Sequence, residues 1–395
     1  MTRILLCYQP TDGGVGRHVS DLAIGLGERG YEIVLCGPAA PGDLAGRIPF
    51  VPLDLGRQIA PRADLAALAG FARILRDVRP DIVHAHSSKA GAVARLVRLS
   101  HPRTPVIYTP HGYAFAGYFS RPAERLAYRG IERSLAPLAS CVVCVCDAEA
   151  RLARSVGPSG RVRVIYNGIE PAGEGPVDAR IAELSRRGPV IGALTLLRPG
   201  KGIETLIDAM PRVLAGHPST QLAILGQGPD LGALRGRARL HGVTDAVHFL
   251  GPSAAPLEAL RGMDVFVHPS WAEAFPYVIL EAMSLGRPIV ASDVGGIGEA
   301  LRDGESGVLV APRDDAALAG ALVDMLDDPD RRERLGATAL ERVGERFTRA
   351  MMVERLASVY DELARFAPVH VQPLDPRPES PPPRSPQAMT HNFTR

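Results

Sequence analysis

The sequence predicts an α/β protein of two domains, each built on a doubly wound parallel sheet. Three observations lead to this prediction. The chain has 395 residues, which is about twice the size of a typical domain. Short apolar runs rich in β-branched residues alternate with helical patterns, as in a parallel sheet covered on both faces. This alternation occurs twice, before and after a stretch rich in Pro, Gly and charge at 170–188. The carboxyl ends of two such sheets should face one another across a ligand-binding cleft.

The first domain is expected to span residues 1–168. Its strands should be the apolar runs at 4–8, 31–36, 82–85, 106–109, 141–146 and 162–166. Helical patterns lie between several of them, at 19–29, 65–78 and 90–99. Cys141, Cys144 and Cys146 share one of these runs, and no second cysteine pair stands at zinc-site spacing. The pattern therefore favours a buried strand over a metal site.

A linker at 169–188, with one short helix, should lead into a second domain at 189–347. Its strands should lie at 190–195, 221–225, 247–249, 265–268, 288–291 and 307–310. A last helix at 348–367 is long enough to reach back across the first domain. Residues 368–395 contain eight prolines and no periodicity, which predicts a disordered tail.

Composition and the N-terminal sequence indicate the cellular compartment. No run approaches the roughly 20 apolar residues that span a bilayer, and the N-terminus leads into a strand without a signal peptide, so we expect a cytoplasmic protein.

The net charge is +2, but residues 1–167 carry a net +8 and residues 168–395 a net −6. Only two of the 45 basic residues are lysines, Lys89 and Lys201. Because ammonium and guanidinium groups do different work, both lysines are candidates for a specific role.

Polar and glycine residues follow three strands of the first domain. Gly13 and Gly14 stand before a helix, where they would let a ligand approach the backbone, although a tight turn fits them as well. His84 and His86 lie on one face of their strand, as ligands in a metal site or as polar caps at the strand end. His111 stands in a Pro-His-Gly turn at the expected cleft, which favours a functional role.

Arg198 and Lys201 open a helix in the second domain, after the strand that ends near residue 195. Two cations at a helix N-terminus repel the helix dipole, so they are costly unless an anion lies between them. A diphosphate would satisfy both charges and the free backbone amides. The alternative is a solvated basic turn.

The densest group of candidate residues follows the strand at 265–268. Glu273 and Phe275 lie in a loop, and Glu281 lies in the next helix among apolar side chains. A carboxylate in such surroundings is costly unless it receives hydrogen bonds, which the paired hydroxyls of a ribose would provide. Gly295 and Gly296 follow the next strand and should expose amides at a helix start.

Together these residues resemble family 4 of the retaining glycosyltransferases (GT4), which have the GT-B fold. Glu273 and Glu281 form the E-x7-E motif of this family. The other matching segments are the Gly13-Gly14 loop, His111-Gly112, Asn167-Gly168-Ile169, Arg198 with Lys201-Gly202, Leu225-Gly226-Gln227-Gly228-Pro229, and Gly295-Gly296 with Glu299. The resemblance covers about residues 3–365. Segments 86–91 and 109–112 are most similar to bacterial members that build exopolysaccharide, capsule or O-antigen repeats.

The resemblance implies transfer of a sugar, with retained configuration, from a UDP-linked donor. Arg198 and Lys201 would bind the diphosphate and stabilise the leaving group, with no metal required. Glu281 would bind the ribose, Glu273 the transferred sugar near its 3- and 4-hydroxyls, and His111 would lie by the C6 hydroxyl. The remaining nucleotide-sugar contacts would come from Gly13, Gly14, Phe275, Gly295 and Gly296. The Asp-x-Asp sequence at 328–330 lies between helices and is expected to cap one of them.

The acceptor is expected to be a glycan, linked to a lipid. On the acceptor side we place Lys89 and a stripe of arginines along one helical face: Arg121, Arg125, Arg129 and Arg133. The aromatic run at 113–119 precedes the stripe. Aromatics beside basic residues suit an anionic bilayer surface, so the protein is expected to be peripheral at the inner face of the cell membrane. A solvated helix face is the alternative.

Two other functions fit the same residues: a nucleotide-sugar epimerase of this fold, and a nucleotide-sugar-binding protein without activity. A dehydrogenase fits poorly, because the ribose-binding acid and the glycine fingerprint are missing. The nucleotide sugar is a substrate, so we expect no cofactor, and we expect no nucleic-acid partner.

Overall fold

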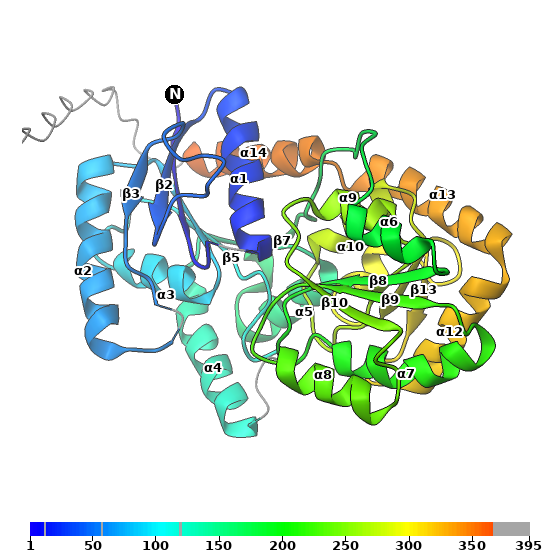
Figure 1. Ribbon diagram of the computed structural model, residues 1–395. Coiled ribbons are helices and arrows are strands. Elements are labelled where there is room, and N and C mark those ends of the chain that lie inside the picture. Colours follow the sequence, from blue (N-terminus) through cyan, green and yellow to red (C-terminus); the bar gives the residue numbers. More distant parts are fainter. Residues whose placement is uncertain (12, 57, 118–120, 366–395) are drawn as a thin grey trace, which may run out of the picture.

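A computed structural model describes residues 1–11, 13–56, 58–117 and 121–365, and these ranges form two α/β domains side by side (Figure 1). Each domain contains a parallel sheet with helices packed on both faces. The predicted fold class, two doubly wound domains, is confirmed. The tail expected at 368–395 lies outside the described residues.

In the first domain the strands follow the order β3-β2-β1-β4-β5-β6-β7. They are β1 (Arg3–Tyr8), β2 (Glu32–Gly37), β3 (Phe50–Pro52), β4 (Ile82–His86), β5 (Val106–Thr109), β6 (Cys141–Cys144) and β7 (Val162–Val164). The main helices are α1 (Gly13–Glu28), α2 (Pro61–Val78), α3 (Ser88–Val97), α4 (Pro122–Leu135) and α5 (Asp147–Val156). Alternation along β1 sends Ile4 and Leu6 to the core under α1, and Leu5 and Cys7 to the core under α2 and α3.

The second domain has the strand order β10-β9-β8-β11-β12-β13. These are β8 (Val190–Leu194), β9 (Gln221–Leu225), β10 (Val247–Gly251), β11 (Val265–His268), β12 (Ile289–Ser292) and β13 (Val308–Val310). Its helices are α7 (Ile203–Gly216), α8 (Leu231–Leu240), α9 (Pro256–Arg261), α10 (Tyr277–Ser284), α11 (Ile297–Ala300), α12 (Asp315–Asp327) and α13 (Pro329–Arg346). The short α6 (Ala179–Ser185) lies in the segment expected to be a linker. The strand order turns back at β1 in one sheet and at β8 in the other, and ligands bind at such points in open α/β sheets.

Two elements differ from the sequence expectation. Strand β3 was not expected, because its three residues are too few to show a pattern. Helix α1 begins at Gly13 rather than near residue 19, because its glycine-rich first turn carries no apolar periodicity.

The expected cap between helices is confirmed: the Asp328 carboxylate accepts a hydrogen bond from the Arg331 N–H at 2.8 Å. The five cysteines are buried and unpaired.

The chain crosses between the domains at two places that touch. Ile169 pairs with Thr348 as an isolated parallel bridge, and a side chain on Gly168 would meet the Thr348 carbonyl at 2.1 Å. After the second crossing, α14 (Arg349–Ala364) packs on α1, and in Figure 1 it extends in orange behind the first domain. Tyr360 of α14 is fully buried in the core of that domain.

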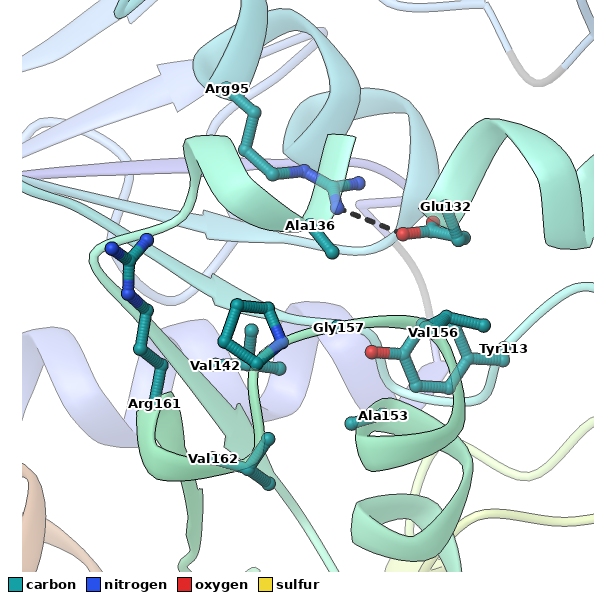
Figure 2. Close-up of a pocket in the computed structure, with 11 residues that line it drawn as sticks. Arg95, Tyr113, Glu132, Ala136, Val142, Ala153, Val156, Gly157, Arg161 and Val162 are labelled. Atoms are coloured by element: carbon teal, nitrogen blue, oxygen red, sulfur yellow. Dashed lines mark hydrogen bonds and ion pairs between the residues drawn. The ribbon is translucent and has the colours of Figure 1, made fainter. Parts of the chain in front are cut away.

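A buried ion pair fastens α4 to α3. The Arg95 guanidinium lies 2.8 Å from the Glu132 carboxylate, and Glu132 also accepts a hydrogen bond from the Tyr108 hydroxyl at 3.0 Å. The same guanidinium lies over the Tyr108 ring at 3.9 Å, and Arg95 is 1% exposed. The cavity beside this pair (Figure 2) has a volume of about 10 Å³, which leaves room for no more than one water. It is therefore part of the scaffold that holds α4 in place.

Candidate active site

The carboxyl ends of the two sheets enclose a cleft of about 670 Å³. The first domain lines it with residues that follow β1, β4 and β5, and the second domain with residues that follow β8 and β11 and with the start of α10. Parallel strands place their loops on the same edge, which explains why motifs far apart in sequence meet here. The cleft contains most of the residues expected to bind the nucleotide sugar.

Lys201 and Glu273 form the polar centre of the second-domain wall. The Lys201 Nζ lies 2.5 Å from Glu273 Oε1, and His268 Nε2 lies 3.2 Å from the same oxygen. Burial acts to raise the pKa of Glu273, but the charge of Lys201 and the hydrogen bond from His268 outweigh it and hold that pKa well below its usual range. Glu273 is therefore a carboxylate with its charge held inside the cleft.

Close backbone contacts bring these two side chains together. A side chain on Gly202 would meet the Pro269 carbonyl at 1.9 Å, so the loops after β8 and β11 are pressed against each other. The Trp271 N–H donates to the Gly200 carbonyl at 2.8 Å across the same contact. Gly202 also has a positive φ of 68°, which glycine adopts without strain.

Arg198 and Glu281 lie on the same wall. Arg198 is exposed, and its position on the cleft wall near Lys201 leaves the guanidinium accessible to a ligand. The Glu281 side chain is 14% exposed and lies 3.4 Å from Arg17 of α1, so an ion pair crosses the cleft. Burial raises the pKa of Glu281, and the charge of Arg17 opposes this rise. Apolar surroundings were expected for Glu281 from the sequence, and its cationic partner was not.

The glycines and the histidine of the first domain line the opposite wall. Gly13 and Gly14 form the first turn of α1. His111 has a positive φ of 55°, and the Gly112 N–H donates to the Glu149 carboxylate at 2.5 Å. Glu149, on α5, therefore fixes the turn that presents His111 to the cleft.

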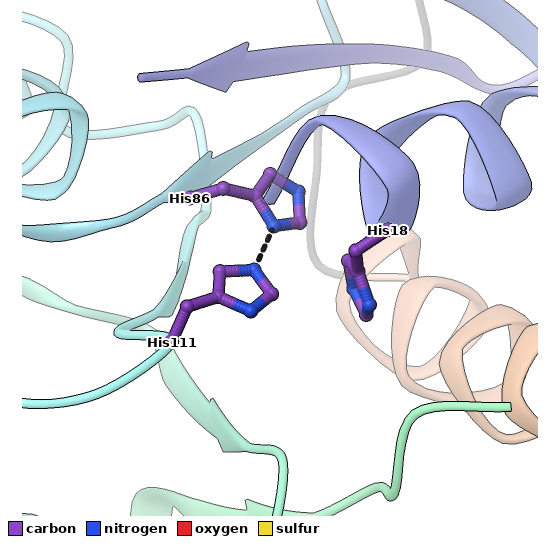
Figure 3. Close-up of side chains that lie close together, drawn as sticks. All are labelled: His18, His86 and His111. Atoms are coloured by element: carbon purple, nitrogen blue, oxygen red, sulfur yellow. Dashed lines mark hydrogen bonds between the residues drawn. The ribbon is translucent and has the colours of Figure 1, made fainter. Parts of the chain in front are cut away.

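Four histidines gather behind this wall. His84 and His86 lie on one face of β4, as expected, with ring centroids 4.0 Å apart. His84 is bonded at both nitrogens, to the Tyr360 hydroxyl at 2.5 Å and to the Thr109 hydroxyl at 2.8 Å, so it is a satisfied core residue. His86, His111 and His18 of α1 form a separate group, which Figure 3 shows with the three rings gathered near the end of β4.

Burial keeps this group of histidines neutral. Burial lowers the pKa of His18 to about 4, although Asn167 opposes the shift. Burial also lowers the pKa of His86 and of His111 well below the usual value, and the neighbouring histidines add to the shift.

Three residues expected to contact the nucleotide sugar have another role. The Gly296 N–H donates to the Ala274 carbonyl at 2.7 Å, so the prediction that this amide faces a ligand is wrong. A side chain on Gly295 would meet the Glu273 carbonyl at 2.0 Å. Neither glycine is among the described residues that line the cleft. Phe275 does line it, but its ring is 4% exposed and packs between Tyr166 and Phe347. These residues shape the loop that carries Glu273.

Side-chain contacts across the cleft hold the domains together. The Glu299 carboxylate accepts hydrogen bonds from the Asp147 and Ala148 N–H groups, both at 2.7 Å, and so caps α5 of the other domain. Asn167 donates to the Phe275 carbonyl at 2.8 Å, and His18 lies 3.1 Å from the Tyr277 hydroxyl. The two domains are therefore in direct contact beside the cleft.

The residues expected on the acceptor side lie outside the cleft. Lys89 forms an ion pair with Asp64 at 2.6 Å. Its neighbours Ser87 and Ser88 are among the described residues that line the cleft, and Lys89 is not. The arginines on and beside α4 are all exposed: Arg121, Arg125, Arg129 and Arg133. Within the described ranges, no helix is both long enough and apolar enough to cross a membrane.

The aromatic run beside this stripe differs from the expectation. Tyr113 is 2% exposed and packs in a core cluster with Tyr108, and Phe115 packs against the same cluster. Tyr113 is therefore a core residue, and Phe115 is partly buried against the same cluster, so these two rings pack inward instead of forming a surface for lipid. Tyr118 and Phe119, the other aromatics of the run, lie outside the described residues.

Sequence reasoning missed Arg17, His18, His268 and Tyr277 as parts of the site. His268 could have been found, because it ends β11 five residues before Glu273. Arg17 lies one turn after Gly13 and Gly14, on the same face of α1, which is a weaker signal.

This arrangement offers two kinds of recognition in one cleft. Arg198 and Lys201 provide positive charge for an anion, and Glu273 and Glu281 provide carboxylate oxygens for hydroxyl groups. Such a combination suits a ligand that carries both phosphates and sugar hydroxyls.

Comparisons with known proteins agree with this reading. Residues 12–172 match the family described as Glycosyltransferase Family 4, and residues 188–328 match Glycosyl transferases group 1. The chain is 30% identical to a glycogen synthase of Mycobacterium tuberculosis, over 88% of this chain and 91% of that one. It is also 30% identical to a phosphatidyl-myo-inositol mannosyltransferase of Mycobacterium leprae, over 89% and 94% of the two chains.

Solved structures share the fold. HepE of Anabaena, in complex with UDP and glucose, superposes with a TM-score of 0.78 at 22% identity, over 92% of this chain and 100% of that one. Sucrose-phosphate synthase of Thermosynechococcus elongatus also gives a TM-score of 0.78, at 24% identity, over 92% and 99% of the two chains. With the matches to both family descriptions and to full-length relatives, the chain belongs to family 4 of the glycosyltransferases and is a sugar-transferring enzyme with the GT-B fold.

Proposed function

We propose that this protein transfers a sugar, with retained configuration, from a UDP-linked donor to a lipid-linked glycan during the synthesis of a bacterial surface polysaccharide. The observation that carries the proposal is the Lys201–Glu273 pair, held at 2.5 Å in the cleft with Arg198 beside it. It combines a cation for phosphate with a carboxylate for sugar hydroxyls. The HepE complex with UDP and glucose supports a donor of this kind.

The residues of the cleft wall have separate roles in the proposed reaction. Arg198 and Lys201 bind the diphosphate and stabilise the negative charge of the departing nucleotide. Glu281 accepts hydrogen bonds from the ribose hydroxyls. Arg17 must move away from Glu281 for these hydrogen bonds to form. Glu273 binds the transferred sugar, and His111 lies at its C6 hydroxyl. Because the two cations supply the positive charge, we propose that transfer needs no metal.

The acceptor side is the first domain. The exposed arginines of α4 fit an anionic membrane surface, and such a surface would supply a lipid-linked acceptor. The named relatives differ in product: one is a glycogen synthase and another a phosphatidyl-myo-inositol mannosyltransferase. The proposal of a lipid-linked acceptor therefore depends on the charge of this domain. We propose that the protein acts at the inner face of the cell membrane.

A screen of nucleotide sugars tests the donor. UDP-sugars, and the GDP-, ADP- and dTDP-sugars as controls, are added to the purified protein, and thermal unfolding is followed. A donor at about 100 times its Kd should stabilise the fold by about 2.7 kcal/mol. The stabilising compound is then incubated with the enzyme and the products are separated. Release of UDP supports transfer chemistry, whereas an epimer of the donor, or no stabilisation by any UDP-sugar, would contradict the proposal.

A further inference from the structure

We propose that His18, His86 and His111 form a binding site for one transition-metal dication of the zinc type, at the first-domain wall of the cleft. The three side chains come from α1, β4 and the turn after β5, and Figure 3 shows their rings turned toward a common region. One ring nitrogen of each residue lies within 4.8 Å of the other two. This site is separate from the cations that bind the diphosphate.

The spacing is close to that of a metal centre. Zinc binds histidine nitrogens at about 2.0–2.1 Å in tetrahedral geometry, which places two ligand nitrogens about 3.3 Å apart. His86 Nδ1 and His111 Nε2 are already 3.1 Å apart. The farthest pair must approach by at most about 1.5 Å, which a rotation of the His18 or His111 ring can supply.

The hydrogen bonds of His18 fix its tautomer in the form that a metal needs. Asn167 donates its amide N–H to the Phe275 carbonyl, so its oxygen is the atom that faces His18 Nδ1 at 3.0 Å. His18 Nδ1 must therefore carry the proton and donate it, which leaves a lone pair on Nε2. Metal-binding histidines are oriented in the same way, by a hydrogen bond from the ring nitrogen that does not bind the metal.

Two buried nitrogens of this group are unsatisfied. Among the described residues, His18 Nε2 and His86 Nε2 have no hydrogen-bond partner, and the two residues are 2% and 0% exposed. The orphan atom that bears on the metal is His18 Nε2, because His86 turns its other ring nitrogen, Nδ1, toward His111. A buried polar atom without a partner is costly, so its presence calls for a ligand. The neighbouring His84 shows the contrast, because both of its nitrogens are bonded.

The donor set selects the ion. Three neutral imidazoles suit Zn²⁺, Co²⁺, Ni²⁺ or Cu²⁺, whereas Mg²⁺ and Ca²⁺ prefer oxygen ligands. Three protein ligands leave a fourth position open, and His111 is part of the cleft wall. Metal binding would hold the His111 ring toward His18 and His86, and so it would compete with the proposed contact of His111 with the donor sugar. This last step rests on the proposed function, and the metal site itself does not.

Metal binding is measured first without any nucleotide. Protein treated with EDTA and dialysed is titrated with ZnCl2 by calorimetry, and with CoCl2 to record the strong visible absorption of tetrahedral Co²⁺. We expect one equivalent of each metal to bind, and MgCl2 to give no signal. His86→Gln and His111→Gln should each weaken zinc binding at least tenfold and abolish the cobalt spectrum, while His101→Gln, a distant control, should leave both unchanged.

Thermal unfolding confirms that each variant is folded, and His111→Gln, at the cleft surface, covers the case in which the buried His86 variant does not fold. The absence of saturable zinc binding by the wild type, or its retention in His111→Gln, would overturn the site. Zinc-loaded protein should also bind the nucleotide sugar at least tenfold more weakly than metal-free protein. Equal affinities would overturn the position of the metal at the cleft wall, whatever the outcome of the donor screen.

Discussion

Lys201 and Glu273 are partners across two loops, 72 positions apart in sequence and 2.5 Å apart in space. Both side chains are at least 85% buried, so little water screens their attraction. Each residue satisfies the charge that the other would otherwise leave unpaired. In the proposed reaction a nucleotide sugar would bind between these two groups, which are already positioned for its phosphates and its hydroxyls.

The first prediction concerns this lysine. Lys201→Met should lower kcat about 100- to 1000-fold in a folded protein, because a fixed positive charge on the leaving group is lost. Turnover of the donor identified in the screen is the measurement. The other lysine gives a matched control: Lys89 is also buried in an ion pair, with Asp64, but outside the cleft wall. Lys89→Met should keep donor affinity, and an unchanged kcat in Lys201→Met would rule out the diphosphate role.

The second prediction concerns Glu281. Glu281→Gln keeps the shape but loses charge-assisted hydrogen bonds worth about 1.5–3 kcal/mol, so UDP should bind about 10- to 150-fold more weakly. Calorimetric titration of UDP into both proteins measures this. The 2′,3′-dideoxy nucleotide is the control, and it should bind wild type and variant alike. If wild type binds it as tightly as UDP, Glu281 does not contact the ribose.

The third prediction concerns Glu149, whose pKa is raised to about 7 by burial, although the Val145 and Gly112 N–H groups oppose the shift. In the unfolded chain a glutamate ionises near 4.5. Between these values the folded state holds a proton that the unfolded state has released. The free energy of unfolding should therefore fall as pH rises from about 4.5 to 7, by up to about 1.4 kcal/mol per pH unit.

Urea unfolding at pH 5 and pH 7.5 measures this dependence. Glu149→Gln cannot titrate, so its stability should vary less between the two pH values than that of the wild type. Glu124→Gln, whose wild-type side chain on α4 is 42% exposed, should behave like the wild type. An equal pH dependence in Glu149→Gln would show that another group is responsible.

The fourth prediction compares a buried and an exposed ion pair on α4. Glu132→Ala leaves the Arg95 guanidinium buried without its partner and should destabilise the fold by about 3–5 kcal/mol. Glu124→Ala removes the partner of Arg121, which is 81% exposed, and should cost no more than about 1 kcal/mol. Denaturant unfolding of both variants decides the matter, and similar losses would contradict the anchoring role of the buried pair.

The fifth prediction concerns the membrane. Each basic residue near an anionic surface contributes about 1 kcal/mol to binding, so replacing all four arginines of the stripe by Gln should release the protein from anionic liposomes. The four are Arg121, Arg125, Arg129 and Arg133. A control of equal charge replaces four exposed arginines of the second half: Arg187, Arg239, Arg334 and Arg346. Co-sedimentation with and without anionic lipid is the assay. Equal partitioning of all three proteins would favour a soluble acceptor.

The sequence was sufficient to predict the alternation of strands and helices in both domains and most of the cleft, because a residue that follows a parallel strand is placed by the fold itself. It could not predict partners across the cleft. Arg17 and Glu281 meet only because the domains close, and no local pattern encodes that geometry. The same holds for His18, which lies within α1 and not directly after a strand.

The pair Gly295-Gly296 shows a different limit. Two glycines after a strand have the same appearance whether they make room for a ligand or for another stretch of backbone. Here they make room for the loop of Glu273. A side chain added at Gly295 would lie 2.0 Å from the Glu273 carbonyl oxygen. Only the packing distinguishes the two cases.

The position of α14 has a consequence for the order in which the protein is completed during synthesis. The core between β1 and α1 is filled by Val353, Leu356 and Tyr360, and Tyr360 bonds to His84 beneath the histidine group. The ribosome makes these residues only after the whole second domain. The domain that emerges first is therefore the last to be finished, and until then its cleft wall lacks the support that holds His84 in place.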